Sequence, residues 1–402
     1  MKRFWMALGE RFFKRIQKGS LRVTYPDGRI KHYGENENAE LHLHVKHPHF
    51  FKRLFLYGDI GFAESYMDEE FECNDLQSLI ALAIANAPSL GTLSEHETNV
   101  PWYNLLPHIN RFRHLLRRNS KTRASKNISE HYDLSNDFFA LMLDKSMMYS
   151  AAIFKDDTDS LYDAQVRKME HLAQKLRLKK GMRVLEIGSG WGSMATYLAS
   201  HYEVHVTTLT LSNEQLKHAK ERFSAHDVED MVEILLQDYR DAKGEFDAII
   251  SIEMFEAVGR EYFDIFFKKC ESLLAPQGVI AMQIITMPDH RYEDYCRGTD
   301  FIQKYIFPGG HLPSIAKLHE VTHEHTSLSV QHIETFGHDY AKTLRIWNDN
   351  FHREVDNVQK LGFDGYFIRM WHMYLAYCEA AFRSSSIDLV QVVFARNPRS
   401  LS

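Results

Sequence analysis

A glycine-rich segment at residues 183–192, with the sequence RVLEIGSGWG, constrains the fold more than any other feature of this chain. Its apolar residues are typical of a buried strand, and Gly188, Gly190 and Gly192 follow before a helical pattern begins. Glycines at such a turn let the backbone approach a ligand that a Cβ would exclude. The spacing is shorter than that of the dinucleotide motif, and the leading acid, Glu186, suits the cationic sulfonium and amino acid end of S-adenosylmethionine (SAM). An ordinary glycine-rich turn between a strand and a helix is the alternative.

The length and composition predict a globular protein with two domains. The chain has 402 residues, of which 44% are hydrophobic and 25% charged. No apolar run approaches the ~18 residues of a membrane span, and the N-terminus lacks the pattern of a signal peptide. The four cysteines are far apart, which indicates reduced thiols in the cytoplasm. A net charge of −6 argues against general binding of nucleic acid.

Two segments depart from this acidic balance. Residues 1–18 carry six Lys and Arg side chains against one acid, Glu10, and they also carry Trp5 and several Phe residues. Residues 111–126 are basic and contain no acid. A basic amphipathic segment with aromatic residues suits the surface of an anionic membrane, so we expect a peripheral protein on the inner face of the cytoplasmic membrane. A solvated helix face and a charged linker are the alternative.

The first ninety residues are expected to form a small α+β domain. Two alternating runs flank Pro26-Asp27-Gly28 and predict a hairpin, and residues 41–45 predict another strand. Residues 51–85 look mostly helical. Several histidines fall in this region. The first two alternate with apolar residues in the strand predicted at 41–45, and no Cys or acid completes a metal site, so we expect no metal. Residues 91–126 are expected to form a basic connector.

From residue 127 to residue 402 the pattern changes to strands that alternate with helices. The strand-like runs lie at 184–187, 204–209, 232–236, 246–252 and 279–285, and a final strand at 389–395. Such alternation predicts an α/β fold with a doubly wound, Rossmann-like sheet of the SAM-methyltransferase kind. Residues 287–325 break the alternation and are expected to form an insertion that covers the substrate.

In a doubly wound sheet, ligands bind beyond the carboxyl ends of the strands. Here the first four strands all end in clusters of glycine or polar residues. After the glycine loop, these are Thr210 and Gln215, then Gln237 and Asp238, then Glu253 and Glu256. Their placement predicts that the ligand and the chemistry share this edge of the sheet.

Several motifs, in their order along the chain, resemble the cyclopropane-fatty-acyl-phospholipid synthase family, which includes the mycolic acid cyclopropane synthases. Besides the glycine loop they are HYDLSNDFF at 131–139, MYSAAIF at 148–154, LQDYRD at 236–241, MFEAVG at 254–259, YIFPGG at 305–310 and QVVF at 391–394. The likeness covers about residues 126–396, and residues 1–90 look like the N-terminal domain of many members. It implies SAM-dependent transfer of a methyl group to a cis double bond in a phospholipid acyl chain, followed by loss of a proton and ring closure.

The resemblance also implies a set of SAM contacts. They would involve Tyr132, Ser150, Gly188, Gly190, Gly192, Thr210, Gln215, Gln237 and Asp238, with Glu186 at the amino acid end. For Asp238 a helix N-cap is an equal alternative, and Ser150 could simply be packed. Aromatic side chains at Tyr305, Phe307, Tyr340 and Trp347 are candidates to stabilise a carbon cation, although most aromatics serve the core.

The site of the base departs from the family pattern. Family members hold a bicarbonate ion with the backbone of a cysteine and with a glutamate, a histidine and a tyrosine. Here Glu256 and Tyr340 keep the pattern, whereas Ala151 stands in place of the cysteine and Gln283 in place of the histidine. Bicarbonate is therefore one expectation for the base. The other is that Glu253 or Glu256, paired at one strand end, replaces or supports it, because an apolar pocket raises the pKa of a carboxyl.

Three functions remain open from the sequence. The leading one is formation of a cyclopropane fatty acid on a membrane phospholipid. A methyltransferase that leaves a methyl-branched, methylene or methylated polyene chain is the second. A catalytically silent protein that binds lipid and SAM is the third. A homodimer would double the basic surface, but the oligomeric state cannot be deduced from the sequence.

Overall fold

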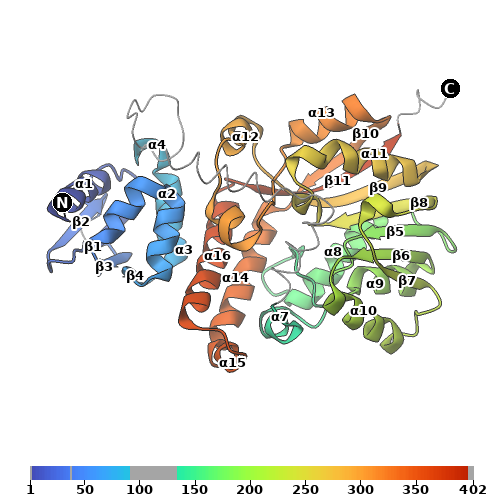
Figure 1. The fold of residues 1–402 in the computed structure, drawn as a ribbon, viewed down its shortest axis with the longest axis horizontal. Coiled ribbons are helices and arrows are strands. Elements are labelled where there is room, and N and C mark those ends of the chain that lie inside the picture. Colours follow the sequence, from blue (N-terminus) through green and yellow to red (C-terminus); the bar gives the residue numbers. More distant parts are fainter. Residues whose placement is uncertain (1, 37–38, 91–133, 397–402) are drawn as a thin grey trace. The chain divides into compact units, whose positions relative to one another are not determined.

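The computed structural model describes residues 2–36, 39–90 and 134–396. The chain divides into two compact units, each with its own sheet (Figure 1). Of the described residues, the first unit holds those up to 90 with 294–306 and 347–386, and the second holds 134–293, 307–346 and 387–396. This division differs from the expected boundaries, because two later segments of the chain join the N-terminal unit. The expected connector at 91–126 lies outside the described residues.

The first unit contains a four-stranded sheet in the order β2-β1-β3-β4. Its elements are α1 (Lys2–Phe13), β1 (Ser20–Thr24), β2 (Ile30–Gly34), β3 (His42–Val45), α2 (His49–Met67), β4 (Phe71–Cys73), α3 (Leu76–Ala85), α4 (Ala87–Leu90), a π-helical turn (Ile302–Ile306), α15 (Val355–Lys360) and α16 (Gly365–Arg383). The expected hairpin is confirmed, since β1 and β2 pair antiparallel across the turn at Gly28. The helical expectation for 51–85 missed β4, a short strand that pairs with β3.

A long C-terminal helix completes the first unit. Asp364 caps the start of α16, which packs against α2 and α3. The Tyr66 hydroxyl hydrogen-bonds Nδ1 of His372 at 2.7 Å, and the Arg369 guanidinium lies 4.0 Å from the centre of the Tyr66 ring. Because Tyr66 lies on α2, these contacts tie residues far apart in the sequence into one core.

The second unit contains a seven-stranded sheet. Its elements are α7 (Asn136–Met142), α8 (Leu161–Lys175), β5 (Arg183–Ile187), α9 (Ser193–Tyr202), β6 (His205–Thr210), α10 (Asn213–Ala225), β7 (Val232–Leu236), β8 (Phe246–Ile252), α11 (Phe263–Leu273), β9 (Leu274–Thr286), α13 (Ile315–His325), β10 (Leu328–Thr335) and β11 (Asp388–Arg396). Short 3₁₀ turns lie at Tyr239–Asp241, Phe255–Ala257 and Arg260–Tyr262. Helices α12 (Asp289–Tyr295) and α14 (Gly337–Arg353) each cross from one unit into the other.

The order of this sheet is β10-β11-β9-β8-β5-β6-β7. Strands β5 to β9 run parallel, and β11 and β10 are added antiparallel at one edge. The chain moves from β5 toward β7 and then returns to β8 on the other side of β5. The order therefore reverses at β5, and the glycine loop follows this strand. This confirms the predicted doubly wound sheet and places the loop where such folds bind ligands.

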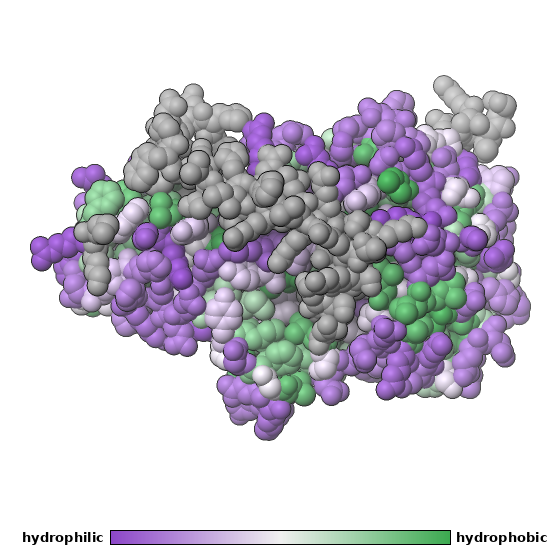
Figure 2. Space-filling view, viewed as in Figure 1, coloured by the Kyte–Doolittle hydropathy of each residue, from purple (hydrophilic) through white to green (hydrophobic). Residues whose placement is uncertain are grey.

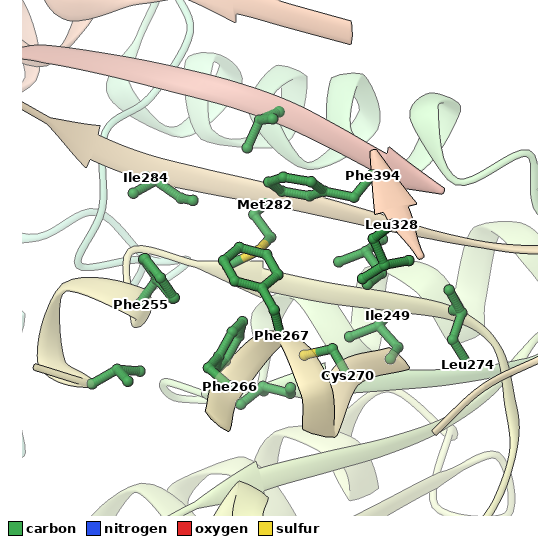
Figure 3. Close-up of a cluster of buried hydrophobic side chains, with 14 of the residues drawn as sticks. Ile249, Phe255, Phe266, Phe267, Cys270, Leu274, Met282, Ile284, Leu328 and Phe394 are labelled. Atoms are coloured by element: carbon green, nitrogen blue, oxygen red, sulfur yellow. The ribbon is translucent and has the colours of Figure 1, made fainter. Parts of the chain in front are cut away.

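Two hydrophobic clusters cover the two faces of the sheet. Apolar side chains of α8, α9 and α10 pack on one face, and those of α11 and α13 pack on the other. Figure 3 shows the second cluster, in which Phe267 of α11 approaches Met282 of β9 and Phe394 of β11. Burial on both faces explains why the central strands read as continuous apolar runs.

Strand β10 was not predicted, although it pairs with β11 over most of its length. Its apolar residues Leu328, Val330 and Ile333 alternate with polar ones, but a register shift between Val330 and His332 breaks the alternation into two short pieces, so its pattern was missed. Within the described residues, no helix is long and apolar enough to span a membrane.

Candidate functional site

The glycine loop joins β5 to α9 in a conformation that requires glycine. The φ angles of Gly188, Gly190 and Gly192 are 99°, 48° and 86°. A Cβ at Gly192 would lie 2.8 Å from the Phe223 ring and 2.9 Å from the Ala219 methyl group. A Cβ at Gly190 would meet no atom of the described residues within 4 Å. The loop thus packs tightly at one end and borders open space in the middle, which fits a ligand held by the backbone.

Glu186 lies on β5, just before this loop. Its side chain is buried, and the Thr208 hydroxyl of β6 donates a hydrogen bond to it at 2.5 Å. Burial raises the pKa of Glu186 to about 8, against the opposing effects of Thr208 and of the positive charge of Lys168. The carboxyl thus has a partner inside the protein, and its contact with the amino acid end of SAM stays a prediction.

The next two strand ends hold the other expected SAM contacts. Thr210 donates a hydrogen bond to Oε1 of Gln215 at 2.8 Å, and both side chains are buried. The Gln237 backbone N–H donates to the Thr210 carbonyl at 2.9 Å. Asp238 accepts hydrogen bonds from the Arg240 backbone at 2.9 Å and from its guanidinium at 2.6 Å. The structure therefore shows Asp238 as a cap of the 3₁₀ turn, which was the alternative interpretation. Tyr132 lies outside the described residues.

The strongest polar cluster of the second unit surrounds Glu253, just after β8. The Ala151 backbone N–H and the Gln283 amide each donate to Oε1 of Glu253 at 2.8 Å. The Tyr340 hydroxyl donates to Oε2 at 2.6 Å. The partners are buried, whereas Glu253 itself is partly exposed. The structure therefore brings four predicted catalytic residues, Ala151, Glu253, Gln283 and Tyr340, together around one carboxylate.

The backbone at Glu253 is unusual for a residue with a side chain. Its φ angle is 48°, in the left-handed region that few residues other than glycine adopt. The Glu253 N–H donates to the Gln283 carbonyl at 2.8 Å, which fixes this turn against β9. Such a conformation persists only where the surroundings hold it, and it is concentrated at functional sites.

A chain of side chains orients the Gln283 amide. Gln391 of β11 donates to Oε1 of Gln283 at 2.9 Å, and His171 of α8 hydrogen-bonds Oε1 of Gln391 at 2.8 Å. Because the Gln283 oxygen is engaged by Gln391, its NH₂ group must face Glu253. Sequence reasoning missed His171 and Gln391, since neither lies at a strand end that the fold class marks as functional.

Glu256, in the turn after Glu253, has a different environment. Its Oε1 accepts a hydrogen bond from the Ile285 backbone N–H. Its Oε2 is buried and has no hydrogen-bond partner in the described part of the chain. Burial, and then the nearby charge of Glu253, raise the pKa of Glu256 to about 8. A neutral carboxylic acid suits this environment better than a charged carboxylate.

A buried lysine on α8 was also missed. Nζ of Lys168 donates to the Ser150 hydroxyl at 2.6 Å, and Gln165 donates to the Ser150 carbonyl at 2.8 Å. Burial lowers the pKa of Lys168 to about 8, while Glu253, Asp144 and Glu186 raise it. The available signal was a lysine on the apolar face of a helix, between Ala164 and Leu172. Lys168 places a positive charge beneath the loop that carries Ala151.

The aromatic candidates are divided between the units. Tyr340 and Phe307 belong to the second unit, while Tyr305 and Trp347 belong to the first. Tyr305 donates to Glu64 of α2 at 2.8 Å, and Trp347 is buried. Within the second unit, Tyr340 is the aromatic residue that reaches the carboxylate cluster.

Comparison with known proteins places this fold and site in a family. The family model "Mycolic acid cyclopropane synthetase" matches residues 119–392, and a domain of unknown function, DUF7884, matches residues 8–95. The chain is 38% identical to the tuberculostearic acid methyltransferase UfaA1 of Mycobacterium tuberculosis, over 94% of this chain and 88% of that protein. It is also 38% identical to the cyclopropane-fatty-acyl-phospholipid synthase of Escherichia coli, over 90% of this chain and 89% of that protein.

Solved structures give the same answer. The cyclopropane synthase MmaA2 from Mycobacterium tuberculosis is 30% identical, with a TM-score of 0.64, over 68% of this chain and 98% of that one. The mycolic acid cyclopropane synthase CmaA1, solved with SAH and CTAB, is 31% identical, with a TM-score of 0.62, over 67% of this chain and 97% of that one. These matches confirm the resemblance seen in the sequence: the chain belongs to the mycolic acid cyclopropane synthetase family and is a SAM-dependent methyltransferase.

Proposed function

We propose that the protein methylates the double bond of an unsaturated acyl chain in a membrane phospholipid and so converts that chain into a cyclopropane fatty acyl chain. The observation that carries this proposal is the ordered carboxylate of Glu253 beyond the end of β8, the strand beside β5 and its glycine loop. An alkene has no acidic proton to remove before it attacks a methyl group, so a base is needed only afterwards. A carboxylate set beside a SAM loop suits that order of events.

The residues of the second unit would divide the work. Gly188, Gly190 and Gly192 offer backbone to SAM, which supplies an electrophilic methyl group when it is bound. Holding that methyl group near the double bond accounts for much of the catalysis, because neither reactant needs activation by a nucleophilic side chain. The aromatic ring of Tyr340 stands beside the carboxylate and can stabilise positive charge on carbon, by ~0.5–2 kcal/mol.

The product is the finer part of the proposal. Loss of a proton from the added methyl group closes a ring, whereas loss from a neighbouring carbon leaves a methylene chain. The equal identity to a tuberculostearic acid methyltransferase and to a cyclopropane synthase keeps the second product as the alternative. A silent protein that only binds SAM and lipid is disfavoured, because it would have no need for the oriented Gln283–Glu253–Tyr340 cluster.

The partner of the first unit is proposed to be an anionic membrane surface. Arg3, Arg11, Lys14 and Arg15 are exposed on or just after α1, and Phe4 is 57% exposed. The single acid of this segment, Glu10, is neutralised by ion pairs with Arg29 and Lys31. Hydrophobic side chains appear beside hydrophilic ones over α1 in Figure 2. Exposed cations beside an exposed aromatic ring support binding at the lipid interface.

The reaction is tested by expressing the chain in a bacterial host that lacks its own cyclopropane synthase. Gas chromatography with mass spectrometry should detect fatty acids with one added CH₂ and a ring, and the Glu253→Gln chain should yield none. A methyl-branched or methylene product would favour the alternative. An unchanged profile in a host supplied with several unsaturated chains, from a protein that still binds SAM, would favour the silent binder.

Membrane contact is tested by reversing charge on α1. We expect the double variant Arg11→Glu, Lys14→Glu to bind anionic vesicles roughly 10–100-fold less tightly, because each basic residue near the surface contributes about 1 kcal/mol. The matched control is Lys217→Glu, Lys220→Glu, which reverses two exposed charges on α10. Equal losses in the two variants, measured by vesicle co-sedimentation, would contradict a specific role for α1.

A further inference from the structure

The donors that were expected to hold a bicarbonate ion hold a side chain of the protein instead. The Ala151 N–H, the Gln283 amide and the Tyr340 hydroxyl all point at the two oxygens of Glu253. A carboxylate and a bicarbonate present the same pair of acceptor oxygens, so one group excludes the other from these donors. A separately bound anion would therefore have to displace the Glu253 carboxylate from these donors.

We infer that the Glu253 carboxylate is the base that takes the proton from the methylated acyl chain, so that this enzyme works without bicarbonate. The inference rests on the proposed function and deepens it. In the proton-transfer step, one C–H bond of the added methyl group breaks. The proton passes to Oε2 of Glu253, and the electron pair forms the second C–C bond to the cationic carbon, which closes the ring.

The contacts of Glu253 suit the ionised form. The Ala151 N–H and the Gln283 NH₂ group can only donate, and Tyr340 donates to the other oxygen. A protonated acid would need an acceptor for its own O–H, and these partners offer none except the tyrosine oxygen. The buried ammonium of Lys168 adds a positive charge that favours the carboxylate. In the part of the chain that the structure describes, Oε2 accepts a hydrogen bond from Tyr340 alone and retains a lone pair for the incoming proton.

Glu256 is assigned the opposite state. Its Oε2 is buried and has no partner among the residues that the structure describes, so a negative charge there would be costly. Burial raises the pKa of both carboxyls, and the nearby charge of Glu253 raises the pKa of Glu256 further. If one of the two carboxyls is ionised, it is Glu253, because three hydrogen-bond donors and the charge of a lysine stabilise its carboxylate. A raised pKa is also what a base needs to accept a proton near neutral pH.

The decisive variant is Glu253→Gly, because glycine adopts the left-handed φ of this position without strain and leaves the three donors free. We expect ring formation to fall by roughly 10²–10⁴-fold, the usual contribution of a general base. Added bicarbonate or formate should restore part of it. Glu253→Gln fills the same space with an amide and should stay inactive with either anion. Wild-type activity should not change in buffer stripped of carbon dioxide.

A binding measurement separates this inference from the proposed function. In the NMR spectrum, ¹³C-labelled bicarbonate should broaden on addition of Glu253→Gly but not on addition of the wild-type protein. This readout needs no turnover, so it holds even if the lipid substrate was misjudged and no product forms. Unchanged SAM affinity, by calorimetry, shows that the variants fold. Wild-type binding of bicarbonate, wild-type activity that requires bicarbonate, or full activity of Glu253→Gln would overturn the inference.

Discussion

The two ends of the site in the second unit are built in opposite ways. At the glycine loop and the strands beside it, polar side chains satisfy one another: Thr210 bonds Gln215, Asp238 bonds Arg240, and Thr208 bonds Glu186. At the end of β8, the polar groups converge on the single carboxylate of Glu253. We infer that the first end leaves recognition of SAM to the backbone and that the second holds one side chain ready for proton transfer. Substitutions should therefore have unequal effects at the two ends.

The largest effect should come from substitutions at the end of β8, where the polar groups converge on Glu253. We expect Glu253→Gln to lower turnover by roughly 10²–10⁴-fold with little change in SAM affinity, because the amide cannot accept the proton. Glu256→Gln should cost about 10-fold or less, since Glu256 is expected to be neutral already. Single-turnover kinetics with SAM and unsaturated vesicles would measure both. A larger loss of turnover for Glu256→Gln than for Glu253→Gln would show that Glu256, and not Glu253, is the base.

The second-largest effect should come from the glycine loop, where the backbone is expected to contact SAM. Gly192→Ala places a Cβ 2.8 Å from Phe223 at a φ of 86°, so we expect a loss of about 1–3 kcal/mol in stability and a clear loss of SAM affinity. Urea unfolding and calorimetry would measure the two quantities. Gly181→Ala is the matched control, because it has a similar φ of 82° and open space at a loop outside the site. Equal loss of SAM affinity in both variants would show that strain alone, and not the loop, is responsible.

Lys168 should act through the pH dependence. Burial raises the pKa of Glu253 and the Lys168 charge lowers it, so Lys168→Met should raise that pKa further. The base is active when deprotonated, so activity is lost as the pH falls through this pKa. The acid limb of the rate profile should therefore move to higher pH, while the rate on the alkaline plateau changes little. Lys168→Arg, which keeps the charge, should leave the limb nearer its wild-type position. An unmoved limb in Lys168→Met would contradict this coupling.

The smallest effect should come from a polar pair at the backbone end. Thr210→Val removes the hydrogen bond to Gln215 and should cost about 0.5–1.5 kcal/mol in stability. If the backbone carries recognition, SAM affinity should fall by less than about 10-fold, the equivalent of one hydrogen bond. Calorimetry on this variant would sharpen the comparison, since a loss larger than that of Gly192→Ala would make the side chains the principal contacts.

Much of the catalytic fold could be predicted from the sequence because its signals are local. The strands that contain Glu186, Thr208 and Ile249 are buried on both faces. Each therefore appears in the sequence as a short apolar run that ends at glycine or polar residues. The reversal of strand order at β5 then followed from the fold class. The same logic found Glu253, because the carboxyl end of a parallel strand is where chemistry is expected.

The residues that support Glu253 were missed because their roles are not local. Lys168 and His171 lie on a helix before the sheet, and Gln391 lies on the last strand. Only the fold brings Lys168 to Ser150, His171 to Gln391 and Gln391 to Gln283. The choice between Glu253 and Glu256 was equally hidden. Both acids follow the same strand, but they have different hydrogen-bond partners. Glu253 also has a left-handed backbone, which no sequence pattern predicts.

The packing of α16 on α2 and α3 has a consequence for synthesis on the ribosome. Residues up to 90 emerge first, but the helix that covers Tyr66 is made only when residues 365–383 have been translated. At a translation rate of about 5–20 residues per second, residues up to 90 remain on the order of 15–60 seconds without helix α16 to cover them. During that interval its apolar surface is available to chaperones or to other nascent chains. The first unit, although its residues up to 90 are translated early, is therefore among the last parts of the described chain to reach its final packing.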